Sequence, residues 1–247
     1  MSKLLVVEGS TIVKGVFKEL LDKDPTFDYK LVGTYAEASA LLSKTRYEFA
    51  VVDRTLSDAP NGEIIALFNK YNIAPFVFTN KDDEDFFESF QSAKIVEYMI
   101  RNKFNNIVNV IEKLKQLQAN KNISVLIVSH SKIYSRYLKE NLNLHNFKVL
   151  SACDNEEALS KIQLHPELSL VVLDQDEPYI DSLTLVQNIR ADKSLKNLKI
   201  LALVDESNAY ATSTLLNSGA DDFIVKQFSR SEFYVRVYQN VKTMQVD

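Results

Sequence analysis

The sequence has little of what secreted, membrane-spanning and nucleic-acid-binding proteins depend on. One cysteine, Cys153, in 247 residues excludes an intrachain disulfide framework and fits a reducing cytosol. The formal net charge of −4 offers no general basic excess to attract nucleic acid. The short apolar run before Glu8 is too brief for the core of a signal peptide, and no run approaches the roughly 20 residues of a membrane span. These absences predict a cytoplasmic protein without direct contact to membrane or nucleic acid.

One set of positions occurs twice along the chain. The first two positions of each set are 45 residues apart and the last two are 22 apart, and each follows an apolar run: Glu8, Asp53, Thr79 and Arg101 in the first half, Ser129, Asp174, Val204 and Lys226 in the second. A repeat this long indicates two domains rather than a solenoid. We expect them at residues 1–119 and 123–247, each long enough to bury its own core.

Short apolar segments alternate with helical patterns, which is typical of a buried parallel sheet. In the first half, strands are predicted near 3–7, 29–33, 48–53, 74–79 and 95–100, with helices near 10–22, 35–45, 61–70, 82–92 and 104–118. Ser10 is the expected N-cap of the first helix. The second half repeats the order, with strands near 123–128, 147–151, 168–174, 199–204 and 222–226. The predicted fold is α/β, with two tandem (βα)5 flavodoxin-like, doubly wound parallel sheets.

The carboxyl ends of parallel strands meet at one edge, so Glu8, Asp53, Thr79 and Arg101 are expected to converge there. Oxygen ligands of this kind suit Mg²⁺, and an aspartate beside the ion can attack phosphorus. The metal and the cation would neutralise charge on the transferred group. Helix capping explains any one of these residues about as well, but the repeated spacing favours a site.

The motifs resemble those of a known family. The segments are VVEGS, VVDRTLSDAPNG, FVFTNKDDED and EYMIRN in the first half, and LIVSHS, VVLDQDEP, LALVDES and GADDFIVKQF in the second. Together they resemble the CheY-like receiver domain of bacterial two-component response regulators, twice over and along almost the whole chain. GADDFIVK is the most specific match. A receiver pair with a degenerate second copy is also similar to the front half of GGDEF-type response regulators, which are diguanylate cyclases.

The resemblance implies roles for residues of the first copy. Asp53 would be the phosphoacceptor, Thr79 and Tyr98 a switch pair, and Arg101 the replacement for the family's lysine. A weak Mg²⁺ site, in the first domain only, would be formed by Glu8, Asp53 and Thr55, and it would be weak because Gly9 stands where the family has a second acid. Asp58 and Asp82 are loop acids that could assist, although solvated loop residues are the simpler interpretation.

The second copy departs further from the family. Ser129 and His130 replace both acids and Val204 replaces the hydroxyl, whereas Asp174 and Lys226 remain and are expected to form an ion pair. His130 is interpreted as an ordinary surface residue rather than a metal ligand. We therefore expect a degenerate pseudo-receiver that serves as an adaptor.

The leading hypothesis is a response regulator module that accepts a phosphoryl group from a histidine kinase or phosphotransfer protein and changes the surface through which it forms a homodimer. The resemblance implies a C-terminal output domain such as a diguanylate cyclase, with this chain as a fragment of a longer protein; the receiver pair itself would not be an enzyme beyond its own phosphorylation and dephosphorylation. A phosphorylation-independent adaptor made of two pseudo-receivers is the alternative. A flavodoxin-like redox protein shares the topology, but EGST at 8–11 is a weak phosphate loop.

Overall fold

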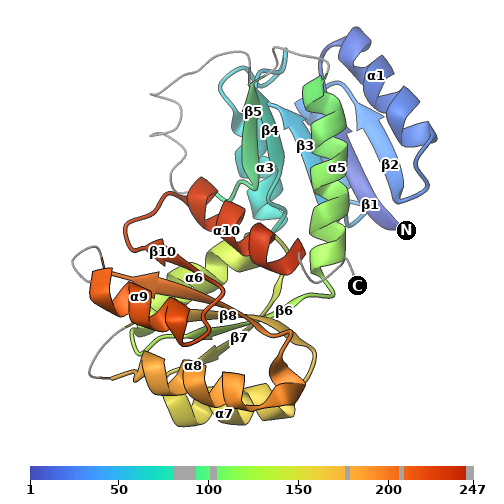
Figure 1. Ribbon diagram of the computed structural model, residues 1–247. Helices are drawn as coiled ribbons and strands as arrows, with labels where there is room; N and C mark the ends of the chain where they lie inside the picture. Colours follow the sequence, from blue (N-terminus) through green and yellow to red (C-terminus); the bar gives the residue numbers. More distant parts are fainter. Residues whose placement is uncertain (80–92, 101–104, 176–178, 206–208, 243–247) are drawn as a thin grey trace. The chain divides into compact units, whose positions relative to one another are not determined.

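The chain divides into two compact units, Met1–Gln118 and Ala119–Asp247 (Figure 1). The computed structural model describes residues 1–79, 93–100, 105–175, 179–205 and 209–242. The predicted helix at 82–92 lies outside these residues. Within them, no helix has the length and apolar character needed to cross a membrane.

The first unit is a five-stranded parallel sheet in the order β2-β1-β3-β4-β5. Its elements are β1 (Ser2–Val7), α1 (Thr11–Asp22), β2 (Phe27–Val32), α2 (Tyr35–Leu42), β3 (Phe49–Asp53), α3 (Glu63–Lys70), β4 (Phe76–Thr79), β5 (Glu97–Ile100) and α5 (Asn105–Asn120). Successive strand residues point to opposite faces, so Leu4 and Val6 pack with α1 and α5, whereas Leu5 and Val7 pack with α2 and α3. Both faces of the sheet are therefore covered, as the continuous apolar strands predict.

The second unit repeats this arrangement. Its elements are β6 (Ser124–Val128), α6 (Lys132–Leu144), β7 (Lys148–Ala152), α7 (Asn155–Leu164), β8 (Leu168–Asp174), α8 (Ser182–Ala191), a short 3₁₀ helix (Lys193–Leu195), β9 (Lys199–Val204), α9 (Ala209–Asn217), β10 (Asp222–Val225) and α10 (Arg230–Lys242). The parallel sheet has the order β7-β6-β8-β9-β10, which is the order of the first sheet. Helices α6 and α10 cover one face, and α7, α8 and α9 the other. The predicted pair of doubly wound α/β domains is confirmed.

Helix starts follow from short-range hydrogen bonds. Ser10 caps α1 as predicted, because its hydroxyl accepts the Val13 amide at 3.4 Å. Helix α3 begins at Glu63, two residues later than predicted, since Gly62 before it has the left-handed φ of 87° and cannot belong to the helix. At α2, the Asp58 carboxylate reaches from the loop after β3 and accepts the amides of the first two helical residues at 2.9 and 3.0 Å.

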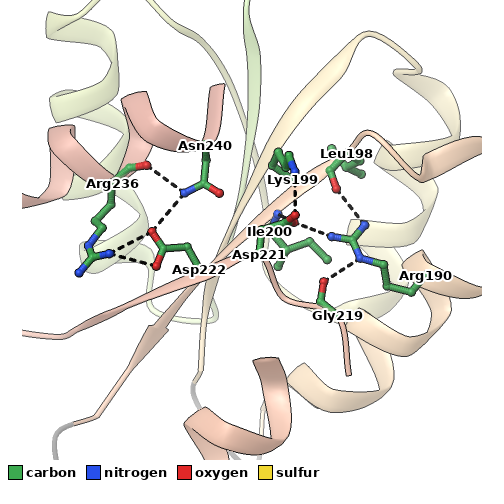
Figure 2. A network of polar contacts seen from close by, with 9 residues as sticks. All are labelled: Arg190, Leu198, Lys199, Ile200, Gly219, Asp221, Asp222, Arg236 and Asn240. Carbon is green, nitrogen blue, oxygen red and sulfur yellow. Dashed lines mark hydrogen bonds and ion pairs between the residues drawn. The ribbon is translucent and has the colours of Figure 1, made fainter. Parts of the chain in front are cut away.

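The glycine of the GADDFIVK motif is required by a close approach. Gly219 has φ +113°, and a Cβ atom there would lie 2.7 Å from Cγ of Arg190. The Arg190 guanidinium instead donates to the carbonyls of Gly219 at 2.7 Å and Leu198 at 2.9 Å, and to the Asp221 carboxylate at 2.6 Å (Figure 2). Asp221 also accepts the Ile200 amide at 2.8 Å. The motif therefore fixes the end of α8 to both β9 and the loop before β10.

The second acid of the motif bonds a different layer of the domain. Asp222, the first residue of β10, accepts from Arg236 at 3.2 Å and from Asn240 at 3.4 Å, and both of these residues lie on α10. Figure 2 shows the two adjacent acids with separate sets of partners, Asp221 beside Arg190 and Asp222 beside Arg236. One dipeptide thereby ties β10 to helices on opposite faces of the sheet.

Candidate functional site

The first site lies at the carboxyl edge of the first sheet. Val7 of β1 pairs with Val52 of β3, so Glu8 and Asp53 occupy successive positions at the ends of adjacent strands. Asp53 pairs with Phe78 of β4, and Thr79 follows directly. Glu8, Asp53 and Thr79 are 1%, 5% and 3% exposed. Two carboxylates and a hydroxyl are therefore buried together at this edge, as the repeat predicts.

The backbone of the following loops orients both carboxylates. Glu8 Oε1 accepts the Ser10 amide at 2.8 Å, and Asp53 Oδ1 accepts the Thr55 amide at 3.0 Å. Thr55 thus contacts Asp53 through its amide, and its contact to a metal stays a prediction. The buried carboxylate pair is compatible with Mg²⁺, which commonly keeps several waters and uses one or two carboxylates.

Gly9 marks the place where a further ligand could be added. A Cβ atom at Gly9 would lie 3.9 Å from Asp53 Oδ2, an ordinary contact distance, and among the described residues other than its chain neighbours no further atom comes within 4 Å of it. A carboxylate on this backbone position would start beside the Asp53 oxygens. The described residues contain no group of three or more His, Cys, Asp or Glu side chains able to hold a metal. The residues present fit a metal held by few protein ligands.

The structure describes two of the four other predicted site residues of the first domain, Asp58 and Tyr98. Asp58 is engaged at the start of α2, which supports the simpler interpretation of that acid over a metal-binding role. Tyr98 is half-buried and packs against the α2 and α3 face of the core. It pairs with Val77, two positions before Thr79 along β4. Arg101 and Asp82 lie outside the described residues, so their roles stay predictions.

At the equivalent edge of the second domain, the Asp174 carboxylate contacts side chains of its own domain. Ser129 donates its hydroxyl to Asp174 Oδ2 at 2.6 Å, and Lys226 Nζ lies 2.9 Å from Oδ1. Lys226 also donates to the Gln175 carbonyl at 2.7 Å and lies 3.5 Å from Asp205. The predicted Asp174–Lys226 ion pair is confirmed. Burial alone would lower the pKa of Lys226, but the hydrogen bond and charge of Asp174, with a smaller contribution from Asp205, outweigh burial and raise that pKa.

Two further replacements change this second edge. Val204 is 1% exposed at the end of β9 and provides no hydroxyl for a phosphoryl oxygen. His130 is exposed and its ring stacks on Tyr179, with the centroids 4.3 Å apart and the planes at 4°. A hydroxyl, an imidazole and an isopropyl group thus stand at the positions that correspond to Glu8, Gly9 and Thr79 of the first edge.

An open cavity of about 600 Å³ adjoins Asp174 and Lys226 in the second domain. Its walls include Tyr134 and Tyr137 of α6 and Phe228 from the loop after β10. Sequence reasoning missed these aromatics, although the three-residue spacing of the tyrosines already places them on one side of a helix.

Comparisons with known proteins agree with this geometry. The family described as response regulator receiver domain matches residues 125–238. The transcriptional regulator ycf27 of Cyanophora paradoxa is 35% identical over 114 residues, which are 46% of this chain and 46% of ycf27. Chemotaxis protein CheY1 of Helicobacter pylori strain J99 is 28% identical over 108 residues, 43% of this chain and 87% of CheY1. This chain thus spans about half the length of the ycf27 regulator that it matches.

Two solved structures match both halves at once. Both are described as two-component system response regulator/GGDEF domain proteins, and both are 25% identical to this chain. Each match covers 99% of this chain and 100% of the other, with TM-scores of 0.86 and 0.85. The receiver signature at residues 125–238, the shared strand order of both sheets and these whole-chain matches lead to one conclusion: the second domain matches the response regulator receiver domain, and the whole chain is similar to the response regulator/GGDEF domain proteins in its tandem pair of α/β domains.

Proposed function

We propose that the first domain is the phosphorylated receiver of the pair and that Asp53 accepts the phosphoryl group. The observation that supports this most is the contrast between the two edges. The first edge buries two carboxylates, Glu8 and Asp53, with the Thr79 hydroxyl, whereas the second edge has one carboxylate, Asp174, with Ser129 and Val204 at the positions of Glu8 and Thr79. Two carboxylates offer Mg²⁺ more ligands than one, and only the first edge has a hydroxyl at the end of the fourth strand of its sheet.

The proposed chemistry uses the chain's own residues for positioning. An oxygen of Asp53 forms a bond to phosphorus while the bond from phosphorus to the donor's imidazole nitrogen breaks, and the imidazole leaves with the electron pair. The Thr55 amide holds the other Asp53 oxygen, and the Thr79 hydroxyl donates to a phosphoryl oxygen. Mg²⁺, when bound by Glu8 and Asp53, supplies positive charge that stabilises the transferred group.

The donor is a histidine kinase or a phosphotransfer protein, and the protein acts in the cytoplasm. Occupation of the site draws Thr79 toward the phosphoryl group and leaves room for Tyr98 to turn inward, which shifts the surface that forms a homodimer. The second domain is a phosphate-independent adaptor. A C-terminal output domain, such as the diguanylate cyclase of GGDEF proteins, belongs to this proposal because both whole-chain structural relatives are described as GGDEF domain proteins.

Phosphodonor labelling tests the assignment. The chain is treated with acetyl phosphate and Mg²⁺, and the labelled aspartate is located by peptide mapping. We expect label at Asp53 that disappears in Asp53→Asn and persists in the matched variant Asp174→Asn. Label on Asp174, or label that survives Asp53→Asn, would overturn the proposal.

Light scattering with and without beryllofluoride tests the consequence. We expect the mass of the full chain to rise on addition of beryllofluoride and Mg²⁺, and Thr79→Ala to abolish that rise. A mass that is the same under both conditions, in a chain that takes up no label, would favour the adaptor alternative in which neither domain is phosphorylated.

A further inference from the structure

The cavity of the second domain has an aromatic wall and an acidic floor. Tyr134 and Tyr137 lie on α6 with ring centroids 6.2 Å apart and planes at 14°, so the two rings are stacked with nearly parallel planes. Phe228 adds a third ring and is held in place by stacking on Phe233, which is 1% exposed, at a centroid distance of 5.2 Å. A volume of about 600 Å³ is within the usual range for small-molecule sites.

The charges in the cavity favour a cation. Its lining contains two carboxylates, Asp174 and Asp205, and one ammonium, Lys226. The ammonium is already engaged by Asp174, by the Gln175 carbonyl and, at 3.5 Å, by Asp205, so it has little to offer an anion. Asp205 is 62% exposed, and its long contact to Lys226 leaves its carboxylate able to accept a stronger donor.

The start of α6 does not reverse this preference. A helix N-terminus attracts anions through its unpaired amides, but Ser131 caps α6 by accepting the Tyr134 amide at 3.2 Å. With that amide satisfied and a net negative lining, an anion would meet repulsion from both carboxylates.

Tyr134 lines the cavity, and its hydroxyl oxygen is buried. Its hydroxyl oxygen has no hydrogen-bond partner among the described residues, which is costly for a buried polar group. Burial, followed by the charges of Asp174 and Asp205, raises the pKa of Tyr134 above its ordinary value, so the phenol stays neutral. The face of such a neutral aromatic ring attracts the positive charge of a ligand.

We propose that this cavity binds a small organic cation with a flat amidinium or guanidinium head. The head donates to Asp205, and the body packs on the rings of Tyr134, Tyr137 and Phe228. The site is independent of phosphorylation at Asp53. It occupies the edge where the receiver chemistry has been lost, and it selects the opposite charge from a phosphoryl group.

A charge series of three similar ligands tests the proposal on the full chain. Benzamidine, benzamide and benzoate share one ring and carry a positive, zero and negative charge. Titration of the ¹⁵N-labelled protein with benzamidine should shift the resonances of amides at the start of α6 and at the carboxyl ends of β9 and β10. Benzamide should bind at least about tenfold more weakly. Equal binding of all three ligands, stronger binding of benzoate, or no shift with benzamidine up to about 10 mM would each overturn it.

Three variants assign the contacts. Asp205→Asn should weaken benzamidine binding about tenfold and leave benzamide binding unchanged, because only the charged hydrogen bond is lost. Tyr134→Phe keeps the ring and removes only the buried hydroxyl, so it should leave benzamidine binding unchanged. Glu140→Gln, which removes an equal charge from the far half of α6, is the matched control and should have no effect. Unfolding transitions measured for every variant establish that each is folded, and benzamidine binding that is unaffected by Asp205→Asn in a folded protein would refute the site.

Discussion

Substitution of Lys226 by methionine probes the edge of the second domain most directly. The methionine keeps most of the apolar stem and removes the ammonium, which leaves Asp174 with the Ser129 hydroxyl. The Asp174 side chain is 3% exposed and that of Lys226 is 22% exposed. Removal of one partner from a fully buried pair costs about 3–5 kcal/mol. Partial exposure of Lys226 and the remaining Ser129 bond reduce this, so we expect a loss of about 2–3 kcal/mol in the free energy of unfolding of the second domain.

Native-state hydrogen exchange can measure this loss one domain at a time. Amides in β6 and β8 report the second domain, and amides in β1 and β3 report the first within the same molecule. We expect faster exchange in β6 and β8 of Lys226→Met, while β1 and β3 remain as in the parent chain.

The double variant Asp174→Asn/Lys226→Met is the control for charge. It removes both charges at once, so no buried carboxylate is left unpaired, and it should recover more than half of the loss. A Lys226→Met loss below about 0.5 kcal/mol, or a double variant no more stable than the single, would refute the argument that the ion pair neutralises Asp174.

The same pair gives a pH dependence with a definite sign. The folded protein raises the pKa of Lys226, so the stability it provides is fully present below the unfolded value of about 10.4. That stability is lost as the pH rises through the higher folded pKa. The stability of the second domain in the parent chain, measured by exchange of the β8 amides, should therefore fall at alkaline pH, and Lys226→Met should lack this part of the fall.

Three further outcomes are expected. Arg190→Lys cannot reproduce the forked contacts to Gly219, Leu198 and Asp221, and it should destabilise the second domain by about 1–3 kcal/mol in urea unfolding; a change below about 0.3 kcal/mol would contradict the fork. Asp58→Asn removes a charge from the start of α2 and should speed amide exchange in its first turn, whereas unchanged exchange would mean that the cap is dispensable. Gly9→Asp should tighten Mg²⁺ binding about tenfold by calorimetry, and unchanged affinity would mean that Glu8 or another acid already fills that role.

The sequence predicts the interior strands β3 and β8 closely and the edge strand β2 less well. Strands β3 and β8 are apolar on both faces, and the apolar runs mark their positions. Strand β2 begins at Phe27, two residues before its predicted start. It lies at the edge of the sheet, and the alternation of Phe27 with Asp28 reflects a strand that is half exposed. A search for continuous apolar runs overlooks such a strand.

The same distinction applies to the sites. The burial of Glu8, Asp53 and Thr79 and the Asp174–Lys226 pair follow from strand ends and register, which periodic patterns encode. The cavity in the second domain depends on which rotamers and loops surround that edge, and no short-range pattern encodes them. The preference for a cation emerges only when the partners of Lys226 are known.

The adjacent acids at the start of β10 make the second domain sensitive to length as well as to composition. Side chains along a strand point alternately to the two faces of the sheet. Loss of one residue between Gly219 and Asp222 would shift the register of β10 by one position, so each carboxylate would point to the opposite face. The carboxylate that contacts Arg190 would then face α10, and the carboxylate that contacts Arg236 would face α8. A single-residue deletion there should lower the stability of the second domain more than replacement of either acid. The length of the motif therefore determines which face of the sheet each acid reaches.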